Sequence, residues 1–179
     1  MYKLLEIDDD YVELFFIFEN LETGTKVACY ELGNFEKDKD LEVFHFMQEG
    51  NIYDCLIMFD GHEVDKKENS WENYYEILEL NVRVGWSKFA KVKLNNDIYY
   101  FEMDSFKNVK DLENKKTVIL SKAEYHLLKI NDVINPVYNI TEEDIPVLIE
   151  KVKNDKKMTK VMQEMAIDYY KKVLKSLQE

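Results

Sequence analysis

Apolar and polar residues alternate most regularly in the middle of the chain. Every second residue is apolar between 78 and 84, and a similar alternation runs from Trp86 to Leu94, after Gly85. This period is that of a β-strand with one face in a core and the other in water. Residues 95–97 (Asn-Asn-Asp) tolerate the left-handed backbone of a short hairpin loop. We therefore predict a β-hairpin here, extended to a three-stranded meander by residues 98–104.

Shorter apolar runs, separated by isolated glycines and charged turns, predict further strands in the first third of the chain. These runs cover residues 2–7, 12–19, 26–32, 43–48 and 53–60. The charged cluster at residues 8–10 is expected to form a tight turn between the first two strands. A succession of short strands with regular turn signals is typical of a small barrel or sandwich. Residues 71–80 fit either a short helix or a strand.

The hydrophobic period changes in the last third of the chain. Residues 121–124 (Ser-Lys-Ala-Glu) match a capping box, which predicts a short helix with apolar residues up to Ile130. A second helix is expected from Thr141, because acidic residues stabilise the positive end of a helix dipole and Pro146 fits in a first turn. A third helix, from about Lys157, places methionine, valine and tyrosine residues on one stripe.

Strands therefore come first and helices last, which predicts an α+β architecture. We expect an antiparallel β-region, barrel-like or sandwich-like, over residues 1–120, with a sub-boundary near 62–70. A small helical region is expected over residues 121–179.

Bulk composition indicates a folded protein. A hydrophobic content of 46% and an aromatic content of 13% are enough to build a core. The longest uniformly apolar run, residues 14–18, is far too short to span a bilayer, which needs roughly 18 residues. The N-terminus lacks the pattern of a secretory signal. Cys29 and Cys55 are expected to be buried, reduced thiols, which suits a cytoplasmic location.

The charge is unevenly distributed along the chain. Residues 1–80 carry 21 acidic side chains and 6 lysines, a net of −15, whereas residues 81–179 carry 15 acidic and 18 basic side chains, a net of +3. An acidic surface attracts a basic protein and repels nucleic acid or anionic membranes. The alternative is that acidic strands only keep a β-rich domain soluble. Arg83 is the sole arginine, which argues against sequence-specific DNA recognition.

Local motifs for chemistry are few. The only acid/base grouping is Asp60, His62 and Glu63 around Gly61, at the end of a predicted strand; the alternative is an ordinary exposed loop. The carboxylates at residues 8–10 lack the spacing of a calcium loop. The sequence contains no nucleophile elbow, zinc motif or glycine-rich phosphate loop, so we predict no catalytic, metal or cofactor site from local motifs.

Two surfaces are candidate interaction sites. The first is formed by Trp86, Phe89, Lys91 and Lys93, where aromatic and basic residues are interleaved and could stack the bases of a single strand. The alternation places Phe89 on the same face as the two lysines and Trp86 on the other face. The Met-rich stripe of the helix from Lys157 fits packing on its own domain, and the alternatives are a membrane surface or a homo-oligomer contact.

Two function classes follow from these observations. The first is a non-enzymatic acidic protein, of inhibitor, immunity or regulatory type, that occupies a basic surface of a partner protein. The second is a small-ligand protein or enzyme with a pocket in the β-region. A structural component of a phage or cell assembly is a third class that the sequence does not separate from the first.

Overall fold

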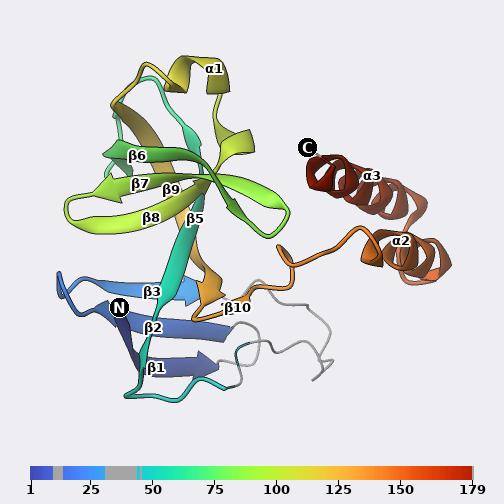
Figure 1. The fold of residues 1–179 in the computed structure, drawn as a ribbon, viewed down its shortest axis with the longest axis horizontal. Helices are drawn as coiled ribbons and strands as arrows, with labels where there is room; N and C mark the ends of the chain where they lie inside the picture. Colours follow the sequence, from blue (N-terminus) through green and yellow to red (C-terminus); the bar gives the residue numbers. More distant parts are fainter. Residues whose placement is uncertain (10–13, 31–43, 45, 179) are drawn as a thin grey trace.

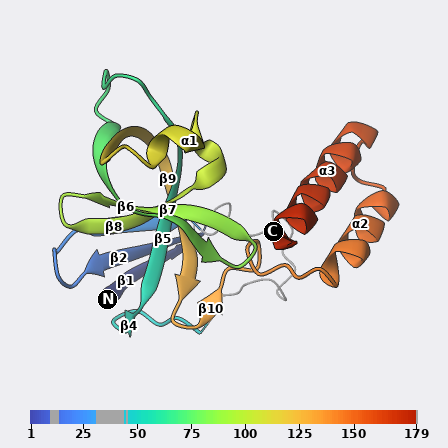
Figure 2. The same ribbon diagram turned by 45° about the horizontal axis from the view of Figure 1, so that its top comes forward.

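The computed structural model describes residues 1–9, 14–30, 44 and 46–178. It confirms the predicted α+β architecture: a five-stranded β-barrel lies within a larger sheet, and a helical hairpin follows at the C-terminus (Figure 1). Turned by 45°, the molecule shows the two last helices standing beside the barrel (Figure 2). None of the helices in the described residues combines the length and the apolar character needed to cross a lipid bilayer.

In the described part of the chain, the sheet contains ten strands. In chain order they are β1 (Tyr2–Asp9), β2 (Leu14–Asn20), β3 (Lys26–Tyr30), β4 (Ile52–Tyr53), β5 (Cys55–Glu63), β6 (Glu72–Val84), β7 (Ser87–Leu94), β8 (Asp97–Glu102), β9 (Thr117–Ile130) and β10 (Val133–Ile134). The helical elements are η2 (Met103–Ser105), α1 (Val109–Leu112), α2 (Asp144–Asn154) and α3 (Lys160–Leu177).

The barrel is closed by strand pairing in the order β9-β5-β8-β7-β6 and back to β9. The pairing of β6 with β9 closes the ring, with Glu72 opposite Ser121 at one end of the ladder. The pairing of β5 with β8 is parallel and short, with Met58 opposite Tyr100. Beyond this pair the two strands run in the same direction, and β5 ends at Glu63 and β8 at Glu102.

A four-stranded antiparallel sheet, in the order β4-β1-β2-β3, extends from the barrel. Its β3 joins β9 by a parallel pairing that places Cys29 opposite Tyr125. Strand β9 therefore belongs to both the barrel and the N-terminal sheet, and it runs unbroken through residues 120 and 121. One continuous core fills the barrel and extends beneath the N-terminal sheet. Its most deeply buried members include Leu4, Phe18, Ile57, Phe59, Tyr75 and Phe101.

The predicted meander is confirmed as β6, β7 and β8. Asn95 has the expected positive φ of 57° in the turn between β7 and β8. Gly85 turns β6 into β7 with a φ of 59°, and a Cβ atom there would lie only 1.6 Å from the carbonyl oxygen of Tyr138. That close approach lets the next residue, Trp86, donate its backbone N–H to the same carbonyl at 3.0 Å. Gly85 thus ties the C-terminal segment to the barrel.

A second core lies on the outer face of the barrel, beneath the C-terminal segment. Strands and helices both contribute to it, through Met58, Val84, Trp86, Phe89, Tyr100, Leu128, Tyr138, Ile145 and Val173. The two helices predicted for the C-terminal region are confirmed as α2 and α3, and both contribute side chains to this core. Pro146 lies in the first turn of α2, and Thr159 caps α3 by accepting from the N–H of Met162. On α3, Val173 is fully buried but Met165 is 69% exposed, so only the C-terminal end of this helix packs on the barrel.

The helix predicted for residues 121–130 is wrong, because this stretch is the second half of β9. Toward the end of this strand, side chains are buried on both faces: Leu127 lies in the first core and Leu128 in the second. A strand covered on both faces has no polar alternation, and an apolar run of this kind resembles a helix. Ser121 uses its hydroxyl to contact His62 instead of capping a helix.

Three smaller expectations are also settled. The strand predicted over residues 43–48 is wrong where it can be judged, since Phe44 and residues 46–48 form turns and irregular structure; residues 43 and 45 lie outside the described part. Asp8 and Asp9 continue β1 instead of turning, and Asp10 lies outside the described residues. Residues 72–80 belong to a strand, β6.

A buried carboxylate links the barrel to the N-terminal sheet. Asp97, at the start of β8, accepts hydrogen bonds from Asn20 Nδ2 at 2.8 Å, Thr23 Oγ1 at 2.6 Å and Thr25 Oγ1 at 2.7 Å. Asn20 is the last residue of β2, and the two threonines lie in the loop between β2 and β3. Because Asp97 is 5% exposed, these donors replace the water that a carboxylate otherwise requires.

We expect Asp97→Ala to lower the free energy of unfolding by about 3 kcal/mol, since it leaves several donors without an acceptor. Urea unfolding followed by tryptophan fluorescence measures the loss. Asp132→Ala, in an exposed turn, is the control and should change little. Equal losses in the two variants would contradict the role assigned to Asp97.

Candidate functional site

The structure does not bring Asp60, His62 and Glu63 together. All three lie on β5, but the pairing of β5 with β9 is irregular between Phe59 and Gly61, so the side chains leave the strand in different directions. Asp60 faces His126, His62 Nδ1 lies 2.9 Å from Ser121 Oγ, and Glu63 is buried beside two lysines. The grouping seen along the sequence is therefore not a three-residue acid/base site.

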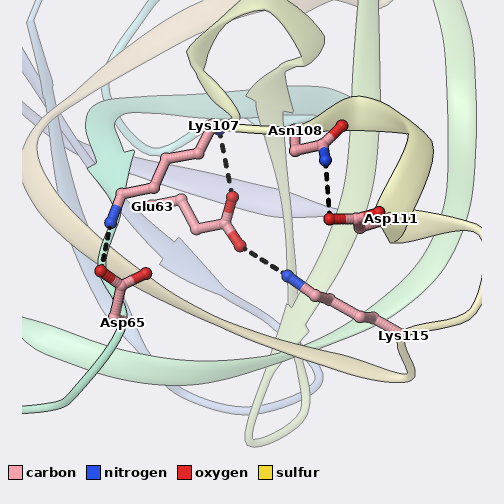
Figure 3. A network of polar contacts seen from close by, with 6 residues as sticks. All are labelled: Glu63, Asp65, Lys107, Asn108, Asp111 and Lys115. Atoms are coloured by element: carbon pink, nitrogen blue, oxygen red, sulfur yellow. Dashed lines mark hydrogen bonds and ion pairs between the residues drawn. The ribbon is translucent and has the colours of Figure 1, made fainter.

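Glu63 is the centre of a polar network at the end of the barrel near α1 (Figure 3). Its Oε1 accepts from Lys115 Nζ at 2.9 Å, and its Oε2 accepts from the backbone N–H of Lys107 at 3.1 Å. The ammonium group of Lys107 turns the other way and pairs with Asp65 at 2.8 Å, and this hydrogen bond lowers the pKa of Asp65. Glu63 thus holds the segment around α1 against β5, which is a structural role.

Asp60 and His126 form a pair in which the histidine is buried and the carboxylate is exposed. His126 is only 1% exposed, whereas the Asp60 side chain is 56% exposed. The Nε2 atom lies 3.0 Å from Asp60 Oδ2, but neither ring nitrogen meets the geometry of a hydrogen bond. In a catalytic dyad the carboxylate is buried and orients a histidine that reaches the substrate. Here the imidazole is inaccessible, so this pair is not arranged as a general base.

A second carboxylate lies near Asp60. Glu102 follows Tyr100 by two residues on β8, just as Asp60 follows Met58 on β5, so the parallel pairing places both acids on one side of the barrel. Burial, and then the charge of Asp60, raise the pKa of Glu102, while the Ser87 hydroxyl donates to it at 3.4 Å. Sequence reasoning missed this neighbour because only the strand register brings it close.

The aromatic-plus-lysine face is not an open stacking platform. Trp86 is 6% exposed and Phe89 is fully buried. Trp86 Nε1 donates to the carbonyl of Val137 at 2.7 Å, and the ring of Phe89 lies 5.4 Å from that of Tyr138. Lys91 is half-buried, and Lys93 pairs with Glu76 at 3.5 Å. The C-terminal segment therefore occupies the face on which bases would have to stack.

Neither of two surface hollows involves the predicted acid/base residues. One, of about 310 Å³, lies between the β6–β7 turn, η2 and α3; the other, of about 580 Å³, runs along α2. Lysine is present in the first hollow, but Lys172 already pairs with Asp104 and Lys175 also has a partner. Within the described residues, no three histidine, cysteine or acidic side chains converge as metal ligands.

The carboxylates of the first half fall into two groups, one neutralised by lysines and one without ion pairs among the described residues. Lysines of the second half neutralise Glu63, Asp65 and Glu76. Six other carboxylates are exposed and have no ion pair within the described part of the chain. These are Glu6, Asp8, Glu22, Glu49, Asp54 and Glu79. The negative charge of these side chains is therefore not neutralised by an ion pair among the described residues.

Comparison with models of protein families, with curated proteins and with solved structures finds no match for this chain. The function is therefore argued from its own residues.

The Glu63 network predicts a difference between a buried and an exposed acid. Glu63→Ala should lower the free energy of unfolding by about 2 kcal/mol, because the Lys107 amide loses its acceptor in a buried site. Asp65→Ala removes an exposed ion pair and should leave the thermal midpoint unchanged within error. Thermal unfolding followed by circular dichroism compares the two. A larger effect for Asp65 would reverse this assignment.

Because the pKa of Glu102 is raised, replacing this carboxyl by an uncharged group is expected to stabilise the protein in a pH-dependent way. A carboxyl whose pKa is raised on folding stabilises the native state below its ordinary pKa of 4.5, and that stabilisation is lost as pH rises through the raised value. Glu102→Gln should therefore raise the thermal midpoint at pH 7 and have little effect at pH 4. Glu79→Gln, at an exposed position, is the control. An equal increase in the thermal midpoint at pH 4 and pH 7 would show that removal of the buried charge is not its cause.

Proposed function

We propose that this protein is a non-enzymatic binding protein whose acidic N-terminal half occupies a basic surface of a partner protein, as an inhibitor, immunity-type or regulatory factor. The observation that carries the proposal is the charge split, a net of −15 over residues 1–80 against +3 over the remainder. Complementary charge steers two proteins together and excludes partners of the wrong sign.

Two features of the structure support this reading. Exposed first-half carboxylates such as Glu6, Asp8 and Glu22 have no ion pair among the described residues, so a partner would not have to displace internal lysines. The imidazole of His126, which lies beside Asp60, is buried and so cannot reach a substrate. This favours binding over catalysis at that position.

The first experiment is a pull-down from the source cell on the immobilised full-length protein, eluted with a salt gradient and analysed by mass spectrometry. We expect a basic protein to be retained at low salt and released sharply as the Debye length falls from about 10 Å at 0.1 M toward 3 Å at 1 M. Retention of a partner that is insensitive to salt would contradict the electrostatic proposal, as would the absence of any basic protein.

A pair of matched triple variants tests which half attracts the partner. Glu6→Gln/Asp8→Asn/Glu22→Gln removes three exposed charges from the first half. Asp132→Asn/Glu142→Gln/Glu143→Gln removes three from the second. We expect the first triple variant to slow association several-fold and the second to behave as wild type, as measured by biolayer interferometry with the captured partner.

A further inference from the structure

We infer that the outer face of β6 and β7 is the contact surface of a symmetric dimer, and that its occupant is a second copy of this chain. The two copies stack the acidic side chains of β6 on the lysines of β7 across a two-fold axis. Self-association of this kind is independent of the basic partner proposed above.

Charge on this face is segregated by strand. The register places Glu76 on β6 directly opposite Lys93 on β7. It also places Glu79 opposite Lys91. Val92, between the two lysines, is fully buried in the first core, so the lysines and the acids opposite them project from the outer face of the barrel. We call the surface formed by Glu76, Glu79, Lys91 and Lys93 the striped face.

The charges of the striped face are available for a contact with another molecule. Lys93 pairs with Glu76 at 3.5 Å, but the two side chains are 35% and 55% exposed, and an exposed pair contributes little to stability. Glu79 is exposed and Lys91 is half-buried, and the described residues provide neither of them with an ion pair. A partner therefore has little internal pairing to displace.

Exposed apolar side chains adjoin the striped face. Ile98 on β8 lies directly opposite Lys93 and is 39% exposed. Tyr74 lies two residues before Glu76 on the same side of β6 and is 61% exposed. Leu78, between the two acids of β6, is 43% exposed. Apolar anchors beside complementary charges are the usual composition of a protein–protein interface.

The arrangement of charge favours a second copy over other occupants. A basic protein would meet the two lysines, and an acidic protein or a nucleic acid would meet the two glutamates. A two-fold axis in the interface, parallel to the strands and midway between β6 and β7, instead places each acidic strand over the basic strand of the other copy. Glu76 then faces Lys93 of the second copy. Glu79 likewise faces Lys91, and the symmetry forms each pair twice.

The striped face is accessible to a partner as large as a second copy. Its end near the β7–β8 turn lies on the side of the barrel away from α2 and α3 (Figure 1). Trp86 and Phe89, farther along the same hairpin, are in contrast covered by α3 and Tyr138.

The net charge of the chain limits the strength of the dimer. Each copy carries a formal charge of −12, so long-range repulsion opposes the contact. We therefore expect a weak dimer that forms at physiological or higher salt, where the Debye length is about 8 Å or less.

Sedimentation velocity of the full-length protein in about 0.15 M salt tests whether it self-associates. Over concentrations from roughly 10 μM to 1 mM, we expect the average mass to rise from that of a monomer toward that of a dimer. A monomer throughout this range would overturn the inference.

Charge reversal tests whether the striped face is the contact. Glu76→Lys/Glu79→Lys makes both strands basic, and Lys91→Glu/Lys93→Glu makes both acidic. Each variant alone should dimerise about tenfold more weakly than wild type, or less, because every pair across the axis becomes repulsive. An equimolar mixture of the two should recover the dimer, since one copy then offers only lysines and the other only glutamates. Variants that had lost their fold could not recover in this way.

The matched control is Glu142→Lys/Glu143→Lys, at exposed positions before α2. It changes the net charge by the same amount as the reversal on β6, and we expect it to leave dimerisation unchanged within about twofold. Equal weakening by both variants would show that net charge, and not the striped face, controls association.

Two further results would count against the striped face. The first is a dimer that persists in both reversal variants; the second is a dimer that Met165→Glu, at an exposed position of α3, abolishes while the reversal variants keep it, which would assign the contact to that helix. If circular dichroism shows that charge reversal disturbs the fold, Glu76→Gln/Glu79→Gln replaces it, with a smaller expected weakening of about threefold.

Discussion

Strand β9 makes the hydrogen bonds on which both parts of the sheet depend. It pairs with β5 and β6 to close the barrel, with β3 to attach the N-terminal sheet, and with β10 near its end. Near its C-terminal end its two faces are covered by different cores, with Leu127 in the first and Leu128 in the second. The chain between β9 and α2 then crosses the barrel, where Gly85 allows the carbonyl of Tyr138 to approach closely. This segment buries Trp86 and Phe89 on the outer face of the barrel.

How far the fold could be predicted depended on how each strand is covered. The meander of β6, β7 and β8 was predictable because turn residues such as Asn95 mark its ends and its apolar residues alternate. The second half of β9 was not predictable in this way. Burial on both faces removes the alternation, and residues 121–124 contain a local helix-start signal that pairing with β5 overrides. The predicted α+β fold is nevertheless confirmed, because most of the other strands and helices show the hydrophobic period of their own class.

The candidate site was less predictable, for a different reason. Asp60, His62 and Glu63 are adjacent in sequence, but an irregularity in the β5–β9 ladder sends them to separate surroundings. The residues that actually lie near Asp60, Glu102 and His126, come from strands far along the chain. No local spacing encodes a contact of that kind, and only register does so. The charge asymmetry needs no register, because it is a sum over residues.

The position of β9 in the chain has a consequence for synthesis on the ribosome. The N-terminal strands emerge first, yet β3 must wait for its partner strand, since Cys29 pairs with Tyr125. Until then the growing chain carries an open sheet edge, which is a template for association with other chains. Nascent chains that share strong negative charge repel one another. The net charge of −15 over residues 1–80 therefore opposes association of unfinished chains during the interval in which β9 has not yet been made.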